Sequence, residues 1–118
     1  MYDKIVRIAL LFDFYGQLLT EKQIEIIDMY YNNDLSLSEI AEQQNISRQG
    51  VYDTLKRAEK TLFEYEAKLG LVNRFLQQKE SLSEINTMLD KILEIEENDV
   101  GLIKDEIENI KIYIENLI

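Results

Sequence analysis

The sequence predicts an all-α protein built on a helix-turn-helix with no winged extension. Three observations predict this fold class. Apolar residues recur at helical spacing along most of the 118 residues, helix-capping pairs punctuate the chain, and proline is absent. The alternation that marks a β-strand is almost missing. The helix-turn-helix is expected in the stretch SLSEIAEQQNISRQGVYDTLKRA, residues 36–58.

The first two helices have ends that the sequence predicts. The first spans about residues 3–15 and stops at Gly16, a residue common just past a helix end. The second begins at Thr20, because Gln23 three residues later completes a capping box. It ends in the polar turn of residues 32–34. Both helices carry apolar residues at spacings of three and four, so we expect both to pack on a core.

The next two helices form the expected helix-turn-helix. Ser36 and Glu39 make a second capping box, Asn45 tolerates the left-handed conformation of a tight turn, and Ser47 caps the recognition helix. The residues expected to pack the two helices together are Ile40, Ala41, Val51 and Leu55, with the turn at Asn45-Ile46. The same residues would also pack an ordinary helical hairpin, so this pattern alone does not assign a recognition role.

A heptad pattern continues beyond Val51 and predicts a recognition helix that runs through Gly70 to about Lys79. The alternative is that Gly70 ends the helix, with Leu71 as the packing residue beyond it. The expected seam is Val51, Leu55, Ala58, Leu62, Tyr65, Leu69, Val72 and Leu76. Ser81 with Glu84 then predicts a new helix start. We therefore expect two domains: residues 1–80, a helix-turn-helix domain with an extended recognition helix, and residues 81–118, a helical hairpin for dimerisation.

Two narrow apolar seams in residues 82–92 and 103–117 need a cover, because such stripes are rarely left in water. They can close within one chain or on a second subunit, and we expect a homodimer. No segment approaches 18 uninterrupted apolar residues, and Asp3 and Asp13 interrupt the N-terminal stretch. The sequence therefore predicts neither a membrane span nor a signal peptide, and we expect a cytoplasmic protein.

The composition argues against catalysis and against general duplex binding. The chain has 23 acidic and 13 basic residues, and it lacks both cysteine and histidine. Without those two residues the commonest nucleophile–base pairs and zinc ligands are missing, so we predict no enzyme, no cofactor and no metal site. The net charge of −10 repels phosphates at long range, which weakens non-specific binding to nucleic acid.

A local basic cluster lies in the recognition helix, where a contact surface is expected. Four basic residues fall between positions 48 and 60, with only Asp53 and Glu59 as acids. The candidate residues for binding nucleic acid or another partner are Arg48, Gln49, Tyr52, Lys56, Arg57 and Lys60. The alternative is a solvated helix face without a partner, since lysines are common on such faces.

Several stretches of the sequence resemble the YlxM family of small bacterial helix-turn-helix proteins. They are LFDFYGQLLTEKQ, YYNNDLSLSEIAEQQNISRQGVYD and YEAKLGL, and they cover roughly residues 1–80. The resemblance implies an all-helical cytoplasmic protein linked to the signal recognition particle pathway. It further implies a regulatory role on the GTPases or RNA of that particle.

Residues 19–62 are more distantly similar to DNA-binding region 4 of sigma factors, but the recognition helix departs from that pattern. Tyr52 and Asp53 stand where the sigma pattern has Arg-Gln, and Gly50 replaces a charged residue. A carboxylate at position 53 can accept from cytosine but repels phosphates. We therefore expect an accessory of the signal recognition particle pathway; the alternative is a dimeric DNA-binding transcriptional regulator.

Overall fold

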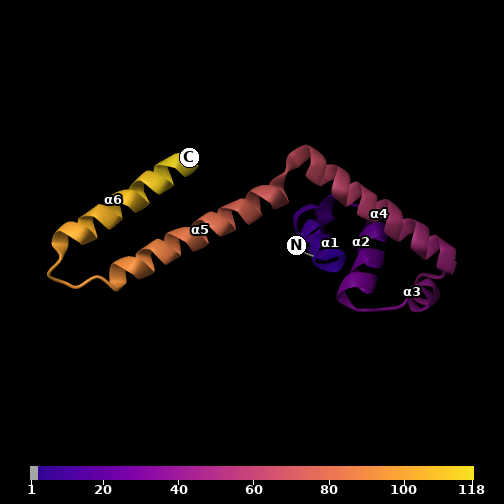
Figure 1. Cartoon of the computed structure of the whole chain (residues 1–118). Coiled ribbons are helices and arrows are strands. Elements are labelled where there is room, and N and C mark those ends of the chain that lie inside the picture. Colours follow the sequence, from indigo (N-terminus) through magenta and orange to yellow (C-terminus); the bar gives the residue numbers. More distant parts are fainter. Residues whose placement is uncertain (1–2) are drawn as a thin grey trace. The chain divides into compact units, whose positions relative to one another are not determined.

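The computed structural model describes residues 3–118 and contains only helices and connecting turns in that range (Figure 1). The all-α fold class predicted from the sequence is confirmed. The structure divides into two units, the first ending at Arg74 and the second spanning Phe75–Ile118. This division falls before the predicted domain boundary at residue 80, and the dimerisation role of the second unit stays a prediction.

The first unit begins with α1 (Lys4–Tyr15), capped by Asp3, and a 3₁₀ turn η1 (Gly16–Leu18). Helix α2 (Glu21–Ile27) follows and runs into a π-helical turn, η2 (Asp28–Asn32). The capping box predicted at Thr20 is present, since its hydroxyl accepts from the Gln23 amide and the Gln23 side chain accepts from the Thr20 amide. Gly16 follows α1 as predicted, although its φ of −55° is helical rather than left-handed.

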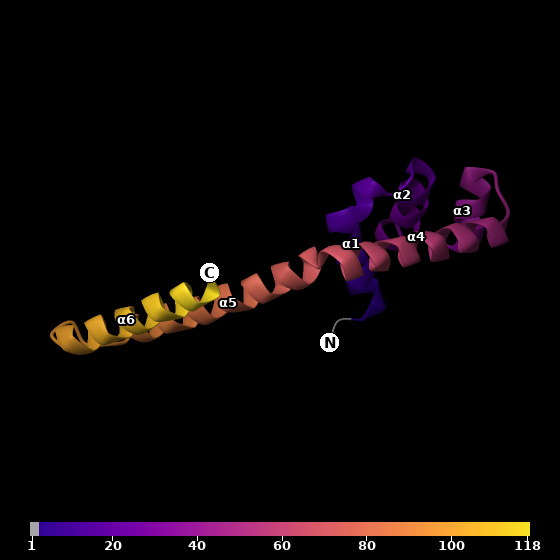
Figure 2. The same ribbon diagram turned by 90° about the horizontal axis from the view of Figure 1, so that it is seen from above.

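Helices α3 (Leu37–Gln44) and α4 (Arg48–Leu69) make the helix-turn-helix. The capping box of Ser36 with Glu39 is present, Ser47 caps α4, and Asn45 is left-handed with φ 56° and ψ 42°. These features are local, so they could be predicted from short stretches of sequence. Figure 1 shows α1, α2 and α3 on one side of α4, and in Figure 2 α1 crosses α4. All three helices contact α4, which is therefore the central helix of the unit.

The core of the first unit lies between α4 and the three shorter helices. Its buried apolar residues are Ile8, Leu11, Tyr15, Leu19, Ile26, Ile27, Ile40, Val51, Leu55, Ala58, Leu62 and Val72. The predicted seam along α4 is thus buried as far as Leu62, whereas Leu69 is exposed. Ile40, Val51 and Leu55 pack the helix-turn-helix as expected, while Ile46 stays at the surface.

The predicted continuous helix to Lys79 is wrong, because α4 ends at Leu69. Gly70 adopts a left-handed conformation, with φ 63° and ψ 23°, and α5 (Leu71–Leu93) starts at the next residue. The predicted helix start at Ser81 is also wrong, since that residue lies inside α5. A left-handed residue breaks the hydrogen-bond ladder of an α-helix, so the recognition helix has 22 residues and not the predicted length.

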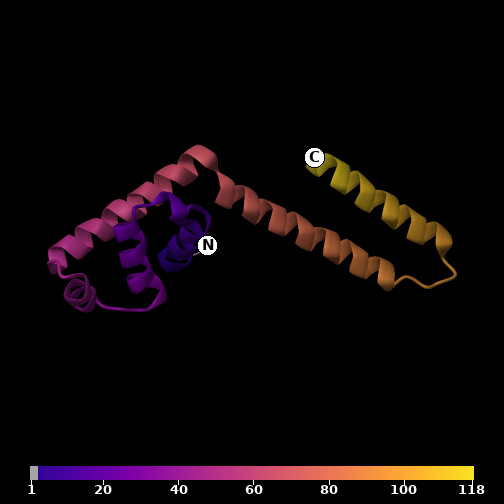
Figure 3. The same cartoon turned by 180° about the vertical axis from the view of Figure 1, so that it is seen from behind.

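The second unit is a helical hairpin formed by α5 from Phe75 onward and α6 (Val100–Leu117). The two helices run in opposite directions and are joined by the turn of residues 94–99, where Asp99 caps α6 (Figure 3). Ile110 of α6 is buried, and Tyr113 of the same helix lines a hollow with Glu80 and Glu84 of α5. Helix α5 starts before residue 81, so the hairpin begins earlier than the sequence predicted, and a separate domain of residues 81–118 stays a prediction.

Candidate partner-binding surface

The N-terminal turn of α4 is fixed by its cap. The Ser47 hydroxyl accepts a hydrogen bond of 2.9 Å from the Gly50 amide, and this bond fixes the point at which the helix begins. A Cβ atom at position 50 would lie 3.1 Å from the Ser47 oxygen and 3.7 Å from Ile46 Cδ1. A side chain there would crowd the cap, which gives Gly50 a structural reason that the sequence did not reveal.

Arg48, Gln49 and Tyr52 project from this turn and line a shallow hollow together with Leu37 of α3. Gln49 Nε2 donates a 2.9 Å hydrogen bond to Asp53 Oδ1, so the carboxylate that departs from the sigma pattern already has a partner. Tyr52 keeps 45% of its surface exposed. A large aromatic side chain with that exposure offers a flat face for stacking or for a cation.

Lys56 lies one turn further along α4 and is shared between two groups. Its ammonium sits 5.4 Å from the centroid of the Tyr52 ring, within the range of a cation–π interaction. The same Nζ atom is 3.6 Å from Glu59 Oε1. Lys56 is therefore held in place on the surface, although about half of its side chain remains accessible to a partner.

Glu59 is the buried carboxylate of this surface, and the sequence alone shows it only as an acid among basic residues. Its side chain is 8% exposed. Lys4 Nζ lies 3.1 Å from Oε1, and Tyr31 Oη donates a 2.9 Å hydrogen bond to Oε2. The one sequence signal was its position four residues after Leu55, on the seam side of α4.

The Glu59 carboxylate perturbs both of its remote partners. Its hydrogen bond and its charge raise the pKa of the Lys4 ammonium above the ordinary value. Burial first, and then the hydrogen bond to Glu59, raise the pKa of the Tyr31 hydroxyl well above its usual range. Lys4 thus stays cationic and Tyr31 stays neutral at physiological pH, so neither group changes its charge there.

A larger hollow adjoins the shallow one and shares Leu37 and Tyr52 with it. Residues of α1, η2, α3 and α4 line it, together with the segment between η2 and α3. Its aromatic and cationic lining residues are Lys4, Tyr30, Tyr31, Tyr52 and Lys56. Tyrosine rings can stack on bases or apolar side chains, and ammonium groups can bind phosphates or carboxylates.

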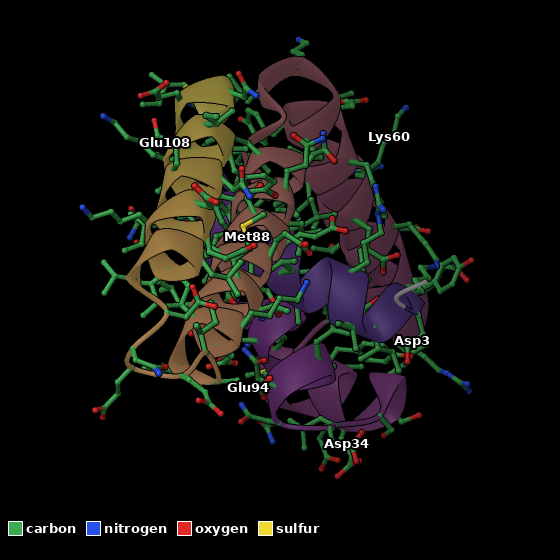
Figure 4. The ribbon with its side chains drawn as sticks, turned by 60° about the vertical axis from the view of Figure 1, so that its left-hand side comes forward. Asp3, Asp34, Lys60, Met88, Glu94 and Glu108 are labelled. Atoms are coloured by element: carbon green, nitrogen blue, oxygen red, sulfur yellow. The ribbon has the colours of Figure 1, made fainter. Side chains whose placement is uncertain are left out.

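The structure brings together four of the six predicted site residues. Arg48, Gln49, Tyr52 and Lys56 line the two hollows, whereas Arg57 and Lys60 line neither. Both of these are exposed, and Figure 4 shows the Lys60 side chain pointing outward from α4. Lys4, Tyr31 and Glu59 are the members that sequence reasoning missed, because α1 and η2 reach this surface only through the tertiary fold.

Residues 3–118 show no sign of two other kinds of site. No group of three or more acidic side chains in this range is arranged to hold a metal ion. No helix in the same range is long and apolar enough to cross a membrane.

Comparison with known proteins adds the family context. The model of the family described as "Putative helix-turn-helix protein, YlxM / p13 like" matches residues 2–103. The chain is 63% identical over 83 residues to a UPF0122 protein of Acetivibrio thermocellus, covering 70% of this chain and 71% of the relative. A UPF0122 protein of Listeria welshimeri is 42% identical over 111 residues, covering 94% and 97% of the two chains. One from Halalkalibacterium halodurans is 50% identical over 91 residues, covering 77% and 84%.

Proposed function

Because this chain belongs to the YlxM/p13-like family of helix-turn-helix proteins, we propose that it is a non-enzymatic regulatory protein of the cytoplasm. We propose that it acts as an accessory of the signal recognition particle pathway and binds the GTPases or the RNA of that particle. The link to this pathway comes from the resemblance of residues 1–80 to the family. The contact surface is inferred from the side chains of α4.

The observation that carries the proposal is the joint exposure of Arg48, Tyr52 and Lys56 along one side of α4, beside the two hollows. Tyr52 presents an accessible ring, and the two cations flank it at one-turn intervals. This combination is suited to a ribonucleoprotein, since rings and cations bind unpaired bases, phosphates and acidic side chains.

The same surface is poorly suited to reading duplex DNA as its main task. The net charge of the chain is −10, and Gly50 and Asp53 depart from the sigma pattern in the recognition helix. A protein with this field gains little from counterion release except at its few exposed cations. We therefore place a protein or ribonucleoprotein partner ahead of DNA.

The test measures binding of the purified full-length chain to the particle's GTPase, to its RNA and to duplex DNA over a range of salt concentrations. The variant Arg48→Glu/Lys56→Glu removes two cations of the surface. The variant Lys68→Glu/Arg74→Glu makes the same change in net charge at exposed positions outside it. Only the first variant should bind more weakly, and its affinity should also depend less on salt, by close to one unit of slope for each phosphate that is no longer bound.

Two results would contradict the proposal. If Arg48→Glu/Lys56→Glu bound with wild-type affinity at low and moderate salt, the surface would be a solvated helix face without a partner. An equal decrease in affinity in both variants would mean that only the total charge matters. Circular dichroism should show that both variants remain helical at the temperature of the assay, which separates a loss of binding from a loss of fold. This control is needed because Lys56→Glu places a second carboxylate near the buried Glu59.

The second candidate is a DNA-binding transcriptional regulator that acts as a homodimer. Its supporting observation is the helix-turn-helix itself, with Arg48 and Gln49 in the first turn of α4, where base contacts are usual. Two copies would bind half-sites about one helical turn apart. Saturable binding of the chain to a palindromic duplex, with no affinity for the particle's components, would favour this candidate over the first.

A further inference from the structure

The C-terminal hairpin, residues 75–118, uses only half of its heptad positions for its own packing. The residues turned toward the partner helix are Ile85 and Ile92 of α5 and Ile103 and Ile110 of α6, all half-buried or buried. The other half of the two seams stays in water. These residues are Leu82 and Leu89 of α5 and Ile107 and Ile114 of α6, here named the outer stripe, and they are 40–66% exposed.

The four residues of the outer stripe lie on one face of the hairpin. At about 100° per residue, Leu82 and Leu89 lie roughly 50° round α5 from Ile85, and Ile107 and Ile114 lie roughly 50° round α6 from Ile110 in the same sense. The helices are antiparallel (Figure 3). Equal rotations about two antiparallel helices turn both pairs toward the same side of the hairpin. The two pairs therefore form one apolar face along the hairpin.

We propose that this face is covered by the outer stripe of a second copy of the chain, so that two hairpins form a four-helix bundle. Each seam residue repeats every seven positions, 82 with 89 and 107 with 114, which is the spacing of residues that interlock between long helices. The packed half of each seam already makes one such interface. The exposed half continues the same pattern on the adjacent face.

The charges around the outer stripe favour a second copy over a basic partner. The hairpin carries eleven acidic and four basic residues. On a helix, the positions three residues before and four residues after a stripe residue lie beside it on its outer side, and none of the acids occupies such a position. Those neighbouring positions instead hold three of the four lysines, Lys79, Lys104 and Lys111. A basic partner would be repelled at this face and would bind the acidic back of the hairpin.

The next row outward on α6 is acidic, with Glu108 and Glu115 each four residues beyond a lysine, and Figure 4 shows Glu108 pointing away from the helix. From the stripe outward the order is therefore apolar, lysine, carboxylate. Two such faces are self-complementary, because the lysines of one copy can reach the carboxylates at the rim of the other.

The size of the face sets the expected affinity. A helix of 18 residues is about 27 Å long, and two neighbouring helices are roughly 20 Å wide, which gives about 500–600 Å² per copy. The total of about 1,000–1,200 Å² lies at the lower end of specific interfaces. We therefore expect dissociation in the micromolar range, and this surface is separate from the one that α4 offers to its partner.

The test is sedimentation equilibrium of the full-length chain at about 1–100 µM. The variant Leu89→Asn/Ile107→Asn changes two stripe residues. Its matched control, Leu102→Asn/Ile112→Asn, changes two residues of the hairpin outside the stripe with nearly the same exposure, 45% and 50% against 47% and 52%. Wild type and control should be dimers, and the stripe variant should dissociate with a constant at least about tenfold higher.

A cross-linking experiment keeps the proposal testable if an asparagine variant loses helicity. The chain has no cysteine, so single cysteines at Leu82, Leu89, Ile107 or Ile114 can be oxidised without side reactions. Disulfide-linked dimers should form from stripe positions and not from Ile112→Cys. A wild-type monomer at 100 µM, equal dissociation of both double variants, or cross-linking at position 112 alone would each overturn the proposal.

Discussion

Tyr15 Oη donates a 2.6 Å hydrogen bond to Oε1 of Glu66, a residue 51 positions away in the sequence. The same tyrosine oxygen accepts from the Leu71 amide, while Oε1 and Oε2 of Glu66 accept from the amides of Val72 and Asn73, each at 3.0 Å. The first amides of α5 are therefore satisfied by two side chains of α1 and α4. This network explains why a new helix can begin directly after Gly70.

The variant Glu66→Gln should lower the free energy of unfolding by about 1–3 kcal/mol. The Glu66 carboxylate accepts from three donors, whereas a glutamine amide would place its own NH₂ group against one of those donors. Urea unfolding followed by circular dichroism measures the change. Glu64→Gln, on an exposed position of the same helix, is the control and should stay within about 0.5 kcal/mol. Equal stability of the two variants would show that the network is not needed for the fold.

Replacing Gly70 by alanine should destabilise the protein by about 1–2 kcal/mol, since a residue with a Cβ atom is strained at a φ of 63°. The added methyl group would not clash with neighbouring atoms, because a Cβ atom at position 70 would meet nothing within 4 Å. Any loss of stability would therefore come from the backbone conformation. Gly101 has the same open surroundings but lies inside α6, so Gly101→Ala should stabilise by about 0.4–1 kcal/mol. Thermal melts in which both variants shift in the same direction would contradict this explanation.

Stability should be nearly constant between about pH 5.5 and 9, because the chain has no histidine or cysteine side chain to titrate there. Burial alone would raise the pKa of Glu66, but the hydrogen bonds from Tyr15 and from two amides hold it below the ordinary value. The stability that Glu66 contributes is therefore complete above the carboxyl pKa of the unfolded chain. It is lost as the pH falls through the lowered folded pKa.

At alkaline pH the dependence of stability on pH has the opposite sign, because stability is lost as the pH rises. Burial, followed by the hydrogen bond to Glu66, raises the pKa of Tyr15. Its contribution is present below the tyrosine pKa of the unfolded chain, about 10, and is lost as the pH rises through the raised folded value. Urea midpoints measured across pH should show a plateau with two falling limbs, and the acid limb should be shallower in Glu66→Gln. A midpoint that changes between pH 6 and 8 would be inconsistent with this assignment.

The variant Glu59→Gln should cost about 2–3 kcal/mol, because it removes the buried carboxylate that Lys4, Tyr31 and Lys56 share. Lys4→Ala should cost less than about 1 kcal/mol, since Lys4 is mostly exposed and the carboxylate keeps its other two partners. Chemical denaturation measures both. If the lysine substitution costs as much as the glutamate substitution, the ion pair and not the buried carboxylate holds α1 on α4.

The helix starts and turns of the first unit could be predicted because they depend on neighbouring residues. The side chains of Thr20, Ser36 and Ser47 each cap a helix by accepting from the backbone amide three residues later. Asn45 forms the turn through its own left-handed conformation. The same local rule failed at Ser81, which has the spacing of a capping box but lies inside α5. Capping residues are compatible with helix interiors, so the motif is informative only where the helix has another reason to begin.

The helix end at Gly70, which the sequence left open, and the burial of Glu59, which it did not show, both depend on contacts between distant segments. Gly70 is compatible with a continuous helix unless Tyr15 and Glu66 hold the amides that follow it. Glu59 is one acid among several unless α1 and η2 cover it with Lys4 and Tyr31. Both carboxylates stabilise the fold through partners more than 25 positions away, apart from local contacts, and no periodicity in a single sequence records such pairs.

The two interactions of Lys56 make folding and recognition share one side chain. An anionic partner that draws the ammonium toward itself must compete with Glu59, so the measured affinity is the difference between the new contact and the one given up. Thermodynamic reciprocity then requires that such a partner loosens the contact between Lys56 and Glu59 by the same free energy with which that contact weakens binding. Glu59 would then keep Lys4 of α1 and Tyr31 of η2 as its partners, so occupancy of the surface on α4 would change the surroundings of a carboxylate that two other elements contact.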